Sequence, residues 1–178
     1  MRIIGGTHKG RIIHAPKNLP VRPTTDRAKE SLFNILGNHF DFTSLSVLDL
    51  FAGTGNISFE FASREAISVV AVDRDHGCVR FIQSVAGELD LNQLDTVKSD
   101  AFVYLRNCSD RFDIIFSDPP YQLNRSPDLA RLVVERQLLL PGGWFILEHP
   151  VQLDVASLEG FFEKRVYGQS AFSFFKMD

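Results

Sequence analysis

The 178-residue sequence is poor in the features that mark secreted, metal-binding and membrane proteins. Its two cysteines, Cys78 and Cys108, offer neither a disulfide framework nor metal-ligand spacing, and its five histidines show no metal spacing, so we expect free thiols and no bound metal. No apolar run approaches the roughly 20 residues that a membrane-spanning helix needs. The opening Met1-Arg2-Ile3-Ile4-Gly5 lacks the hydrophobic region of a secretory signal. These absences predict a cytoplasmic protein without a membrane segment.

The sequence also lacks linkers, internal repeats and low-complexity segments. With 44% hydrophobic residues it is long enough for one domain with a substantial core, and we expect a monomer. The net charge of −3 is unevenly distributed, because residues 1–30 hold seven Lys and Arg but two acidic residues, which leaves +5 there and −8 in the rest. We predict an acidic body with a basic N-terminal segment.

Apolar segments of strand length alternate with helical patterns from residue 46 onward. Strands are predicted at residues 47–51, 69–73, 96–98, 112–116 and 143–147, and two more in the tail at 162–167 and 171–176. Apolar residues recur at helical spacing between them, over 57–64, 79–89 and 129–133. Repeated strand–helix units require right-handed crossovers, so the sequence predicts an α/β domain whose mostly parallel sheet is covered on both faces.

The N-terminal segment is predicted to form a β-hairpin followed by an extended arm. Residues 2–4 and 11–14 are typical of two short strands around a glycine-rich turn, and three prolines then keep the chain extended. Thr24 or Thr25 can cap the helix that follows. We therefore divide the chain into a basic appendage, residues 1–23, and a main domain, residues 24–178.

Gly53-Thr54-Gly55 comes directly after the first predicted strand of the domain. Two glycines in this place let the backbone approach a ligand closely and free amide groups at the next helix N-terminus. With Asp73 at the tip of the second strand to take ribose hydroxyls, the pattern suits NAD and S-adenosylmethionine nearly equally, and a plain turn is the alternative. Ser58 leaves the dinucleotide pattern without its third glycine. Asp49 favours S-adenosylmethionine, because an acid suits an ammonium or sulfonium group better than a pyrophosphate.

An acid also closes the third predicted strand. Asp100 can reach an adenine amino group, with Phe102 packing near the ring, and the equal alternative is that Asp100 caps a helix. These residues complete the predicted cofactor-binding set. The set contains Asp49, Phe51, Ala52, Gly53, Thr54, Gly55, Asp73, Arg74, Asp100, Ala101 and Phe102.

Asp118-Pro119-Pro120-Tyr121 follows the fourth predicted strand. An exocyclic amine has its lone pair delocalised into the ring, so a methylating site needs acceptors that grip the N–H groups and aim the nitrogen at the methyl group. Asp118 and the Pro119 carbonyl can supply these acceptors, the prolines stiffen the loop, and Tyr121 can stack on the base. A rigid turn is the alternative. In a doubly wound sheet of order 3-2-1-4-5 the first and fourth strands are neighbours, so this motif and the glycine turn should line one crevice.

With both motifs and the opening block, the chain resembles the RsmD family of 16S ribosomal RNA guanine-N2 methyltransferases over nearly its whole length. The most distinctive matches are Arg2-Ile3-Ile4-Gly5-Gly6, Lys9-Gly10-Arg11 and Arg22-Pro23-Thr24-Thr25-Asp26-Arg27-Ala28-Lys29-Glu30-Ser31-Leu32-Phe33-Asn34, a block that generic methyltransferases lack. Residues 51–55 correspond to the family's cofactor turn, with Thr54 where serine is usual. Tyr121 stands where phenylalanine is also used.

The resemblance implies a Rossmann-like class I methyltransferase fold with seven strands in the order 3-2-1-4-5-7-6. It implies S-adenosylmethionine as donor, S-adenosylhomocysteine as product, and one guanine of 16S rRNA within a small ribosomal subunit or assembly intermediate as acceptor. The basic segment would then engage RNA phosphates, each adding about 0.7–0.9 to the salt slope of binding, and solvated hairpin charges are the alternative. The RNA-binding candidates are Arg2, His8, Lys9, Arg11, Arg22 and Arg27.

Three other functions are compatible with parts of the sequence. A DNA adenine-N6 methyltransferase uses the same Asp-Pro-Pro-Tyr chemistry, but such enzymes usually need an extra target-recognition region. A nicotinamide-dependent oxidoreductase is disfavoured by the missing third glycine and by the lack of an acid or base for hydride transfer. An RNA-binding assembly factor without catalysis would need neither Asp118 nor the glycine turn.

Overall fold

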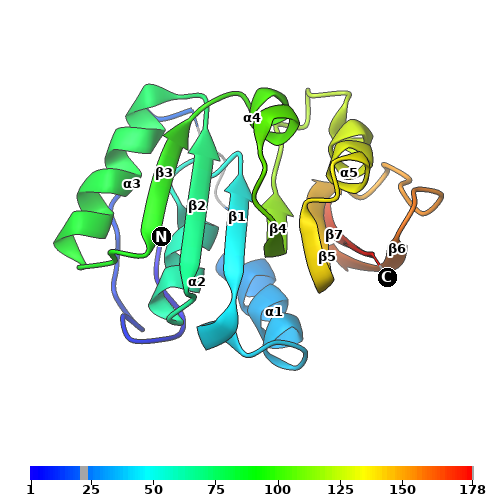
Figure 1. The fold of residues 1–178 in the computed structure, drawn as a ribbon. Helices are drawn as coiled ribbons and strands as arrows, with labels where there is room; N and C mark the ends of the chain where they lie inside the picture. Colours follow the sequence, from blue (N-terminus) through cyan, green and yellow to red (C-terminus); the bar gives the residue numbers. More distant parts are fainter. Residues whose placement is uncertain (21–23, 178) are drawn as a thin grey trace.

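The computed structural model describes residues 1–20 and 24–177 and shows a seven-stranded sheet between two layers of helices (Figure 1). The strands are β1 (Ser46–Leu50), β2 (Ser68–Asp73), β3 (Leu94–Lys98), β4 (Phe112–Ser117), β5 (Leu139–Pro150), β6 (Phe161–Tyr167) and β7 (Ser170–Lys176). Their order in the sheet is β3-β2-β1-β4-β5-β7-β6. β7 is antiparallel to β5 and β6 and the other neighbours are parallel, so the predicted order and the mostly parallel arrangement are confirmed.

The five α-helices cover the two faces of the sheet unequally. They are α1 (Asp26–Gly37), α2 (Asn56–Ser63), α3 (His76–Glu88), α4 (Ala101–Asn107) and α5 (Ser126–Glu135). Alternate residues of β1 point to opposite faces, so Val47 packs in one core with Ile82 of α3, whereas Leu48 packs in the other with Leu129 of α5. The first core also takes α1 and α2, and the second takes α4. Every helix in the described ranges is too short or too polar to span a bilayer.

Local caps explain where two of these helices begin. Thr25 has extended backbone dihedral angles and its side chain accepts a hydrogen bond from Ala28 N, so Thr25 rather than Thr24 is the cap of α1. α4 is the helix that the cap alternative for Asp100 implied, and Asp100 caps it through bonds from Phe102 N and Val103 N. A short 3-10 helix, η1 (Phe42–Ser44), was not predicted.

The predicted N-terminal hairpin is present but much shorter than expected. Its antiparallel pairing consists of one bridge between Arg2 and Ile12, with backbone bonds from Ile3 N to Arg11 O at 2.9 Å and from Ile13 N to Met1 O at 2.8 Å. The two strands expected at residues 2–4 and 11–14 do not form, because the segment bonds instead to α2. This segment runs over the same face of the sheet as α2 and reaches the edge where the strands end (Figure 1).

The central pair of strands positions the two sequence motifs. β1 and β4 are parallel neighbours, with Leu50 opposite Ser117 at their carboxyl ends. The glycine turn leaves β1 and the Asp-Pro-Pro-Tyr loop leaves β4 from this same edge. Ligands bind at such a point in open α/β sheets, because the connecting helices on either side diverge to opposite faces.

Candidate active site

The glycine turn and the Asp-Pro-Pro-Tyr loop lie along one cavity of about 800 Å³. This size falls within the range of roughly 300–1,000 Å³ that is usual for small-molecule sites. From the predicted residues the cavity is lined by Asp49, Phe51, Ala52, Gly53, Thr54, Asp73, Arg74 and all four residues 118–121. Gly55 and residues 100–102 do not line this cavity. It therefore brings together most, but not all, of the predicted cofactor-binding and catalytic residues.

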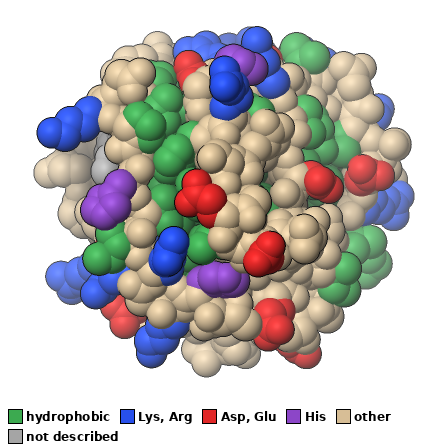
Figure 2. Space-filling view, turned by 90° about the vertical axis from the view of Figure 1, so that its left-hand side faces the viewer, with side chains coloured by type: hydrophobic (Ala, Val, Ile, Leu, Met, Phe, Trp, Pro, Cys, Tyr) green, Lys and Arg blue, Asp and Glu red, His purple; other side chains and the backbone are tan. Residues whose placement is uncertain are grey.

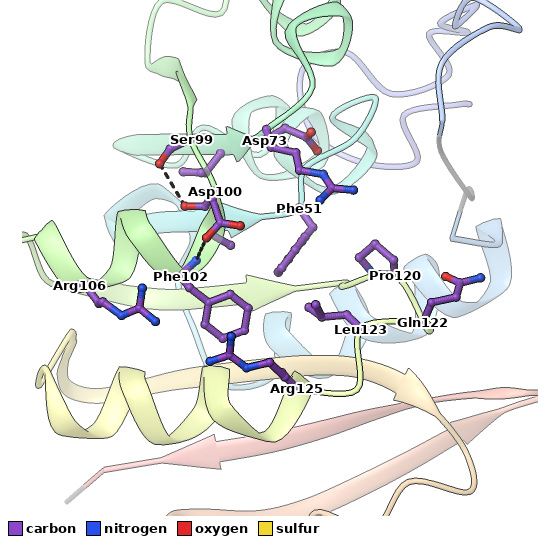
Figure 3. Close-up of a pocket in the computed structure, with 13 residues that line it drawn as sticks. Phe51, Asp73, Ser99, Asp100, Phe102, Arg106, Pro120, Gln122, Leu123 and Arg125 are labelled. Atoms are coloured by element: carbon purple, nitrogen blue, oxygen red, sulfur yellow. Dashed lines mark hydrogen bonds between the residues drawn. The ribbon is translucent and has the colours of Figure 1, made fainter.

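A second cavity of about 430 Å³ adjoins the first and is lined by the remaining cofactor candidates except Gly55, which lines neither cavity (Figure 3). Asp100, Ala101 and Phe102 line it, with Ser99 beside them. Five residues line both cavities: Phe51, Asp73, Arg74, Pro120 and Gln122. The two cavities are therefore neighbours that share a wall, which includes Asp73, and we refer to them together as the crevice.

The glycine turn is held in a strained backbone conformation by hydrogen bonds to β2. Phe51, Gly53 and Gly55 have φ angles of 58°, 56° and 79°, a region that non-glycine residues seldom adopt. Gly53 N donates to Asp73 Oδ2 at 2.8 Å, which fixes the carboxylate at the cavity wall. A Cβ on Gly55 would lie 2.9 Å from Ile82 Cγ1, so no side chain fits there. Gly55 therefore allows α2 and α3 to pack closely, whereas Gly53 lines the larger cavity.

Asp49 is a buried acid at the floor of the larger cavity, 2% exposed. Ser58 Oγ donates to its Oδ2 at 2.5 Å, so the residue that interrupts the dinucleotide pattern is the hydrogen-bond partner of Asp49. Burial raises the pKa of Asp49 to about 7, against the lowering effect of the Ser58 bonds. A cation placed in the cavity would favour the ionised form. The expectation that Asp49 meets a positively charged group stays a prediction with a compatible geometry.

Asp100 and Phe102, which follow β3, both contribute to the start of α4 and line the smaller cavity. The Oδ1 atom of Asp100 accepts bonds from Phe102 N at 2.9 Å and Val103 N at 3.1 Å, which confirms the helix-cap alternative. Its side chain also lines the smaller cavity, so the cap does not remove it from a ligand. The guanidinium of Arg125 lies over the Phe102 ring, 4.7 Å from the centroid.

The Asp-Pro-Pro-Tyr loop is fixed at both ends by backbone bonds. Asp118 N donates to Leu50 O at 3.4 Å, which ties the loop to the end of β1, and Leu123 N donates to Pro120 O at 2.8 Å, which closes a turn. Pro119 is buried and Tyr121 is half-buried beside the larger cavity. The loop thus holds a carboxylate, a backbone carbonyl and an aromatic ring next to the glycine turn.

The predicted RNA-binding residues lie outside the crevice, on the N-terminal segment and the start of α1. Arg2, Lys9, Arg11 and Arg27 are exposed and His8 is half-buried, whereas Arg22 lies outside the described residues. Arg2 pairs with the exposed Asp26 at 3.7 Å. Figure 2 shows Lys and Arg side chains mainly toward the edges of one face, with Asp and Glu side chains nearer its centre.

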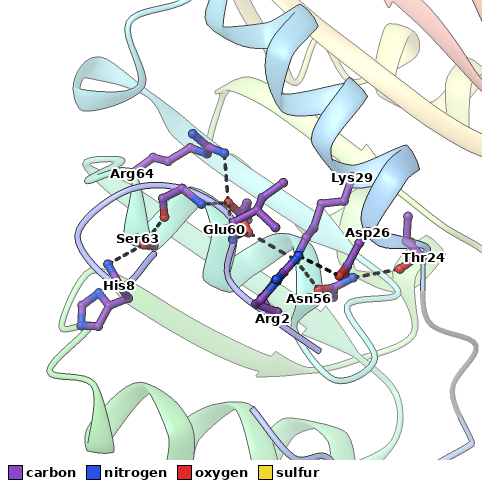
Figure 4. A network of polar contacts seen from close by, with 11 residues as sticks. Arg2, His8, Thr24, Asp26, Lys29, Asn56, Glu60, Ser63 and Arg64 are labelled. Carbon is purple, nitrogen blue, oxygen red and sulfur yellow. Dashed lines mark hydrogen bonds and ion pairs between the residues drawn. The ribbon is translucent and has the colours of Figure 1, made fainter. Parts of the chain in front are cut away.

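A buried network attaches this basic segment to α2 (Figure 4). Glu60 is fully buried and accepts bonds from Ile4 N at 3.1 Å and Gly5 N at 2.8 Å. It also pairs with Lys29 at 3.3 Å and Arg64 at 3.0 Å. The segment is thus part of the domain surface, held by charges that the sequence reading passed over.

The network reaches the crevice through Asn56, the first residue of α2. Lys29 Nζ donates to Asn56 Oδ1 at 2.9 Å and to Arg2 O at 2.6 Å. Asn56 Nδ2 donates to Thr24 O at 3.4 Å, and Thr24 Oγ1 donates to Glu148 Oε2 at 3.2 Å. Asn56 and Thr24 both line the larger cavity.

Several cavity residues were missed by sequence reasoning. Leu19, Pro20 and Thr24 belong to the segment assigned to the appendage or its border, yet they form a wall of the larger cavity. In the smaller cavity the missed residues include Arg106, Gln122, Leu123 and Arg125. Their position just after the Asp-Pro-Pro-Tyr motif was the available signal for Gln122 and Leu123. No pattern marked the others.

The donor set of the crevice fits S-adenosylmethionine. Asp73 is anchored by Gly53 N and by Asp75 N, both at 2.8 Å, and each oxygen retains a lone pair for a ribose hydroxyl. The buried Asp49 suits a cationic centre, and Phe102 offers an aromatic surface at the opposite end. Among the described residues no cluster of His, Cys, Asp and Glu could hold a metal ion, and the expectation of a metal-free site stays a prediction.

Comparison with known proteins agrees with this geometry. The chain matches the family described as "Conserved hypothetical protein 95" over residues 1–176. It is 34% identical to YlbH of Bacillus subtilis over 99% of this chain and 98% of that protein, and 30% identical to Ribosomal RNA small subunit methyltransferase D of Haemophilus influenzae over 83% and 78%. The solved structure of Thermus thermophilus hypothetical protein TTHA0928 superposes with a TM-score of 0.88 at 28% identity, covering 99% of both chains. The chain therefore belongs to the Conserved hypothetical protein 95 family, which is the RsmD family that its opening residues resemble.

Proposed function

We propose that this protein transfers a methyl group from S-adenosylmethionine to the exocyclic N2 amine of a guanine in 16S rRNA, within a small ribosomal subunit or assembly intermediate. The observation that carries the proposal is the single crevice that the glycine turn and the Asp-Pro-Pro-Tyr loop line together. The relatives add support, since one of them is named a ribosomal RNA small subunit methyltransferase. Guanine N2 itself rests on the family resemblance.

The cofactor would occupy both parts of the crevice. Asp73 would bind the ribose hydroxyls at the junction, and Phe102 would pack on the adenine in the smaller cavity. Asp49 and the glycine turn would hold the methionine end in the larger cavity, where the ionised carboxylate of Asp49 balances positive charge. When bound there, S-adenosylmethionine would supply an electrophilic methyl group in the cavity that the Asp-Pro-Pro-Tyr loop also lines.

The loop would position the amine rather than remove its proton in a separate step. The Asp118 carboxylate and the Pro119 carbonyl would accept hydrogen bonds from the two N–H groups of the guanine amine. These bonds would aim the nitrogen lone pair at the methyl carbon. Tyr121 would stack on the extruded base and keep its plane fixed. Because Asp118 is tied to β1 by its backbone, the acceptors are oriented before the substrate arrives. After transfer the product amine carries an extra proton, which the adjacent Asp118 carboxylate can take.

The test uses small ribosomal subunits that lack the modification, incubated with methyl-labelled S-adenosylmethionine beside naked rRNA and duplex DNA. Digestion and mass spectrometry would identify the labelled nucleoside. We expect N2-methylguanosine from the subunits. Asp118→Asn should lower kcat by about a hundredfold or more, because an amide loses the charged acceptor, while cofactor affinity stays within twofold.

The matched control is Asp95→Asn, which makes the same change at an exposed residue of β3 away from both cavities. Its kcat should equal that of the wild type. Label in DNA as N6-methyladenine would refute the rRNA assignment in favour of a DNA methyltransferase. Cofactor binding without transfer to any substrate would favour an assembly factor that has no catalytic activity.

A further inference from the structure

Two exposed arginines, Arg106 and Arg125, line the smaller cavity from different segments of the chain. Arg106 lies in the last turn of α4, and Arg125 directly precedes α5. Both line the cavity, and Figure 3 shows their guanidinium groups on the same side of it, next to the Phe102 ring. Both side chains are exposed to solvent. We call this pair the arginine shelf.

The arginine shelf lies at the predicted adenine end of the crevice, where bound S-adenosylmethionine would have no negatively charged group. Asp100 and Phe102 mark the predicted adenine end, whereas the carboxylate of the methionine moiety would lie near the glycine turn in the larger cavity. An adenine ring presents no negative charge to two guanidinium groups. The shelf therefore has a positive charge that the proposed cofactor does not use.

Local ion pairs use little of this charge. Asp128 pairs with Arg125 Nε at 3.1 Å and with Arg131 at 2.7 Å, so one carboxylate is shared by two guanidinium groups. The pair engages only the Nε atom of Arg125, and the guanidinium carries two further nitrogens. Its contact with the Phe102 ring orients those nitrogens at the cavity rim.

The shelf and the basic N-terminal segment flank the loop that would receive the target base. Pro120 and Gln122 line both cavities, with Thr24 of the N-terminal side in the larger one and Arg125 in the smaller one. When a base is flipped out of its strand, the protein must also bind the RNA backbone on both sides of that base. The N-terminal side has its own cations, and among the described residues the cations that line the smaller cavity are Arg74, Arg106 and Arg125.

From these observations we infer that Arg106 and Arg125 bind backbone phosphates of the RNA on the flank of the target guanine opposite the N-terminal segment. This inference rests on the proposed function. Arginine suits the role, because its planar guanidinium donates two parallel hydrogen bonds to phosphate oxygens. The contacts fix the position of the RNA strand and carry no sequence information.

The test measures KM for unmodified small subunits, kcat, and the dissociation constant of S-adenosylmethionine for a set of variants. Arg106→Gln should raise KM about two- to fivefold, and Arg106→Gln with Arg125→Gln about five- to twentyfold, with kcat little changed. Each lost phosphate contact should make the dependence of log KM on log salt shallower by about 0.7–0.9. Arg125→Lys should raise KM less than Arg125→Gln, because lysine retains the charge but loses the two parallel hydrogen bonds and the flat contact with Phe102.

The matched control is Arg111→Gln, which removes the same charge from an exposed residue that precedes β4, at the opposite edge of the sheet. It should leave KM unchanged. An equal rise of KM in this control, or weaker cofactor binding with unchanged KM in the shelf variants, would overturn the inference. The two proposals fail differently: no methylation by the wild type refutes the function, whereas normal methylation with unaffected shelf variants refutes the shelf alone.

Discussion

Removing the charge of Glu60 should destabilise the protein more than removing that of its partner Lys29. Both side chains are almost fully buried, and Glu60→Gln keeps the shape and an acceptor for the Ile4 and Gly5 amides. It leaves the Lys29 ammonium in the interior with only the neutral acceptors of Arg2 and Asn56. Breaking a buried pair in this way costs about 3–5 kcal/mol.

Lys29→Met should cost less, about 1–3 kcal/mol. The Glu60 carboxylate would still be balanced by Arg64 and by two backbone amides, so only the acceptors of Lys29 lose a partner. The double variant has no isolated charge at the Lys29–Glu60 site. It should therefore be more stable than the sum of the single losses predicts, with a coupling energy above about 1 kcal/mol.

Urea unfolding at pH 7 of the wild type, both single variants and the double variant measures this cycle. A loss of 3 kcal/mol corresponds to a Tm lower by about 6–12 °C for a chain of this length. Hydrogen exchange at the Ile4 and Gly5 amides reports separately whether the N-terminal segment stays attached. Equal losses in the two single variants that simply add in the double variant would refute the reasoning, since the charges would then be independent.

Three further predictions concern the crevice and the core. Because burial raises the pKa of Asp49 to about 7, binding of cationic S-adenosylmethionine at pH 7 should ionise it and release a proton; calorimetry in two buffers of different ionisation enthalpy measures this, and Asp49→Asn should remove the difference. Gly55→Ala combines a φ of 79° with a Cβ 2.9 Å from Ile82, so it should cost about 2–4 kcal/mol in urea unfolding; a loss below 1 kcal/mol would contradict the packing argument. Burial lowers the pKa of His149, whose Nε2 lies 2.7 Å from Ser173 Oγ. Because the unfolded chain binds that proton more readily, the stability that His149 contributes should be lost as pH falls through about 6.5, and Ser173→Ala should cost about 1–3 kcal/mol at pH 8 by leaving the ring nitrogen without its partner.

The parts of the fold that follow from short-range pattern were predictable. Buried parallel strands such as β1 and β4 appear as short, mainly apolar segments, each containing one aspartate, and they are neighbours in a doubly wound sheet of order 3-2-1-4-5. The Asp-Pro-Pro-Tyr loop and the glycine turn each directly follow such a strand. Their meeting in one crevice was therefore deducible once the sheet order 3-2-1-4-5 was assumed.

Other parts depend on partners that are distant in sequence. Ser58 looked like a gap in a glycine pattern, and its bond to Asp49 became visible only with α2 packed against β1. Glu60 and Lys29 occupy helix positions where a charge usually faces solvent, so nothing local indicates that both are buried. The same reason explains the shortened hairpin, because the amides of Ile4 and Gly5 bond to Glu60 rather than to an opposite strand.

The attachment of the N-terminal segment to α2 also bears on the order in which the chain folds. Ile4 and Gly5 are synthesised before α2, and their acceptor on Glu60 is separated from them by 56 and 55 residues. During synthesis the amides of these two residues have no Glu60 partner until β1 and α2 have emerged from the ribosome. Closing a loop of that length carries an entropic cost that the early chain cannot offset, so the docking belongs to a late step of folding. The N-terminal segment is thus synthesised before α2 but attaches to it late in folding.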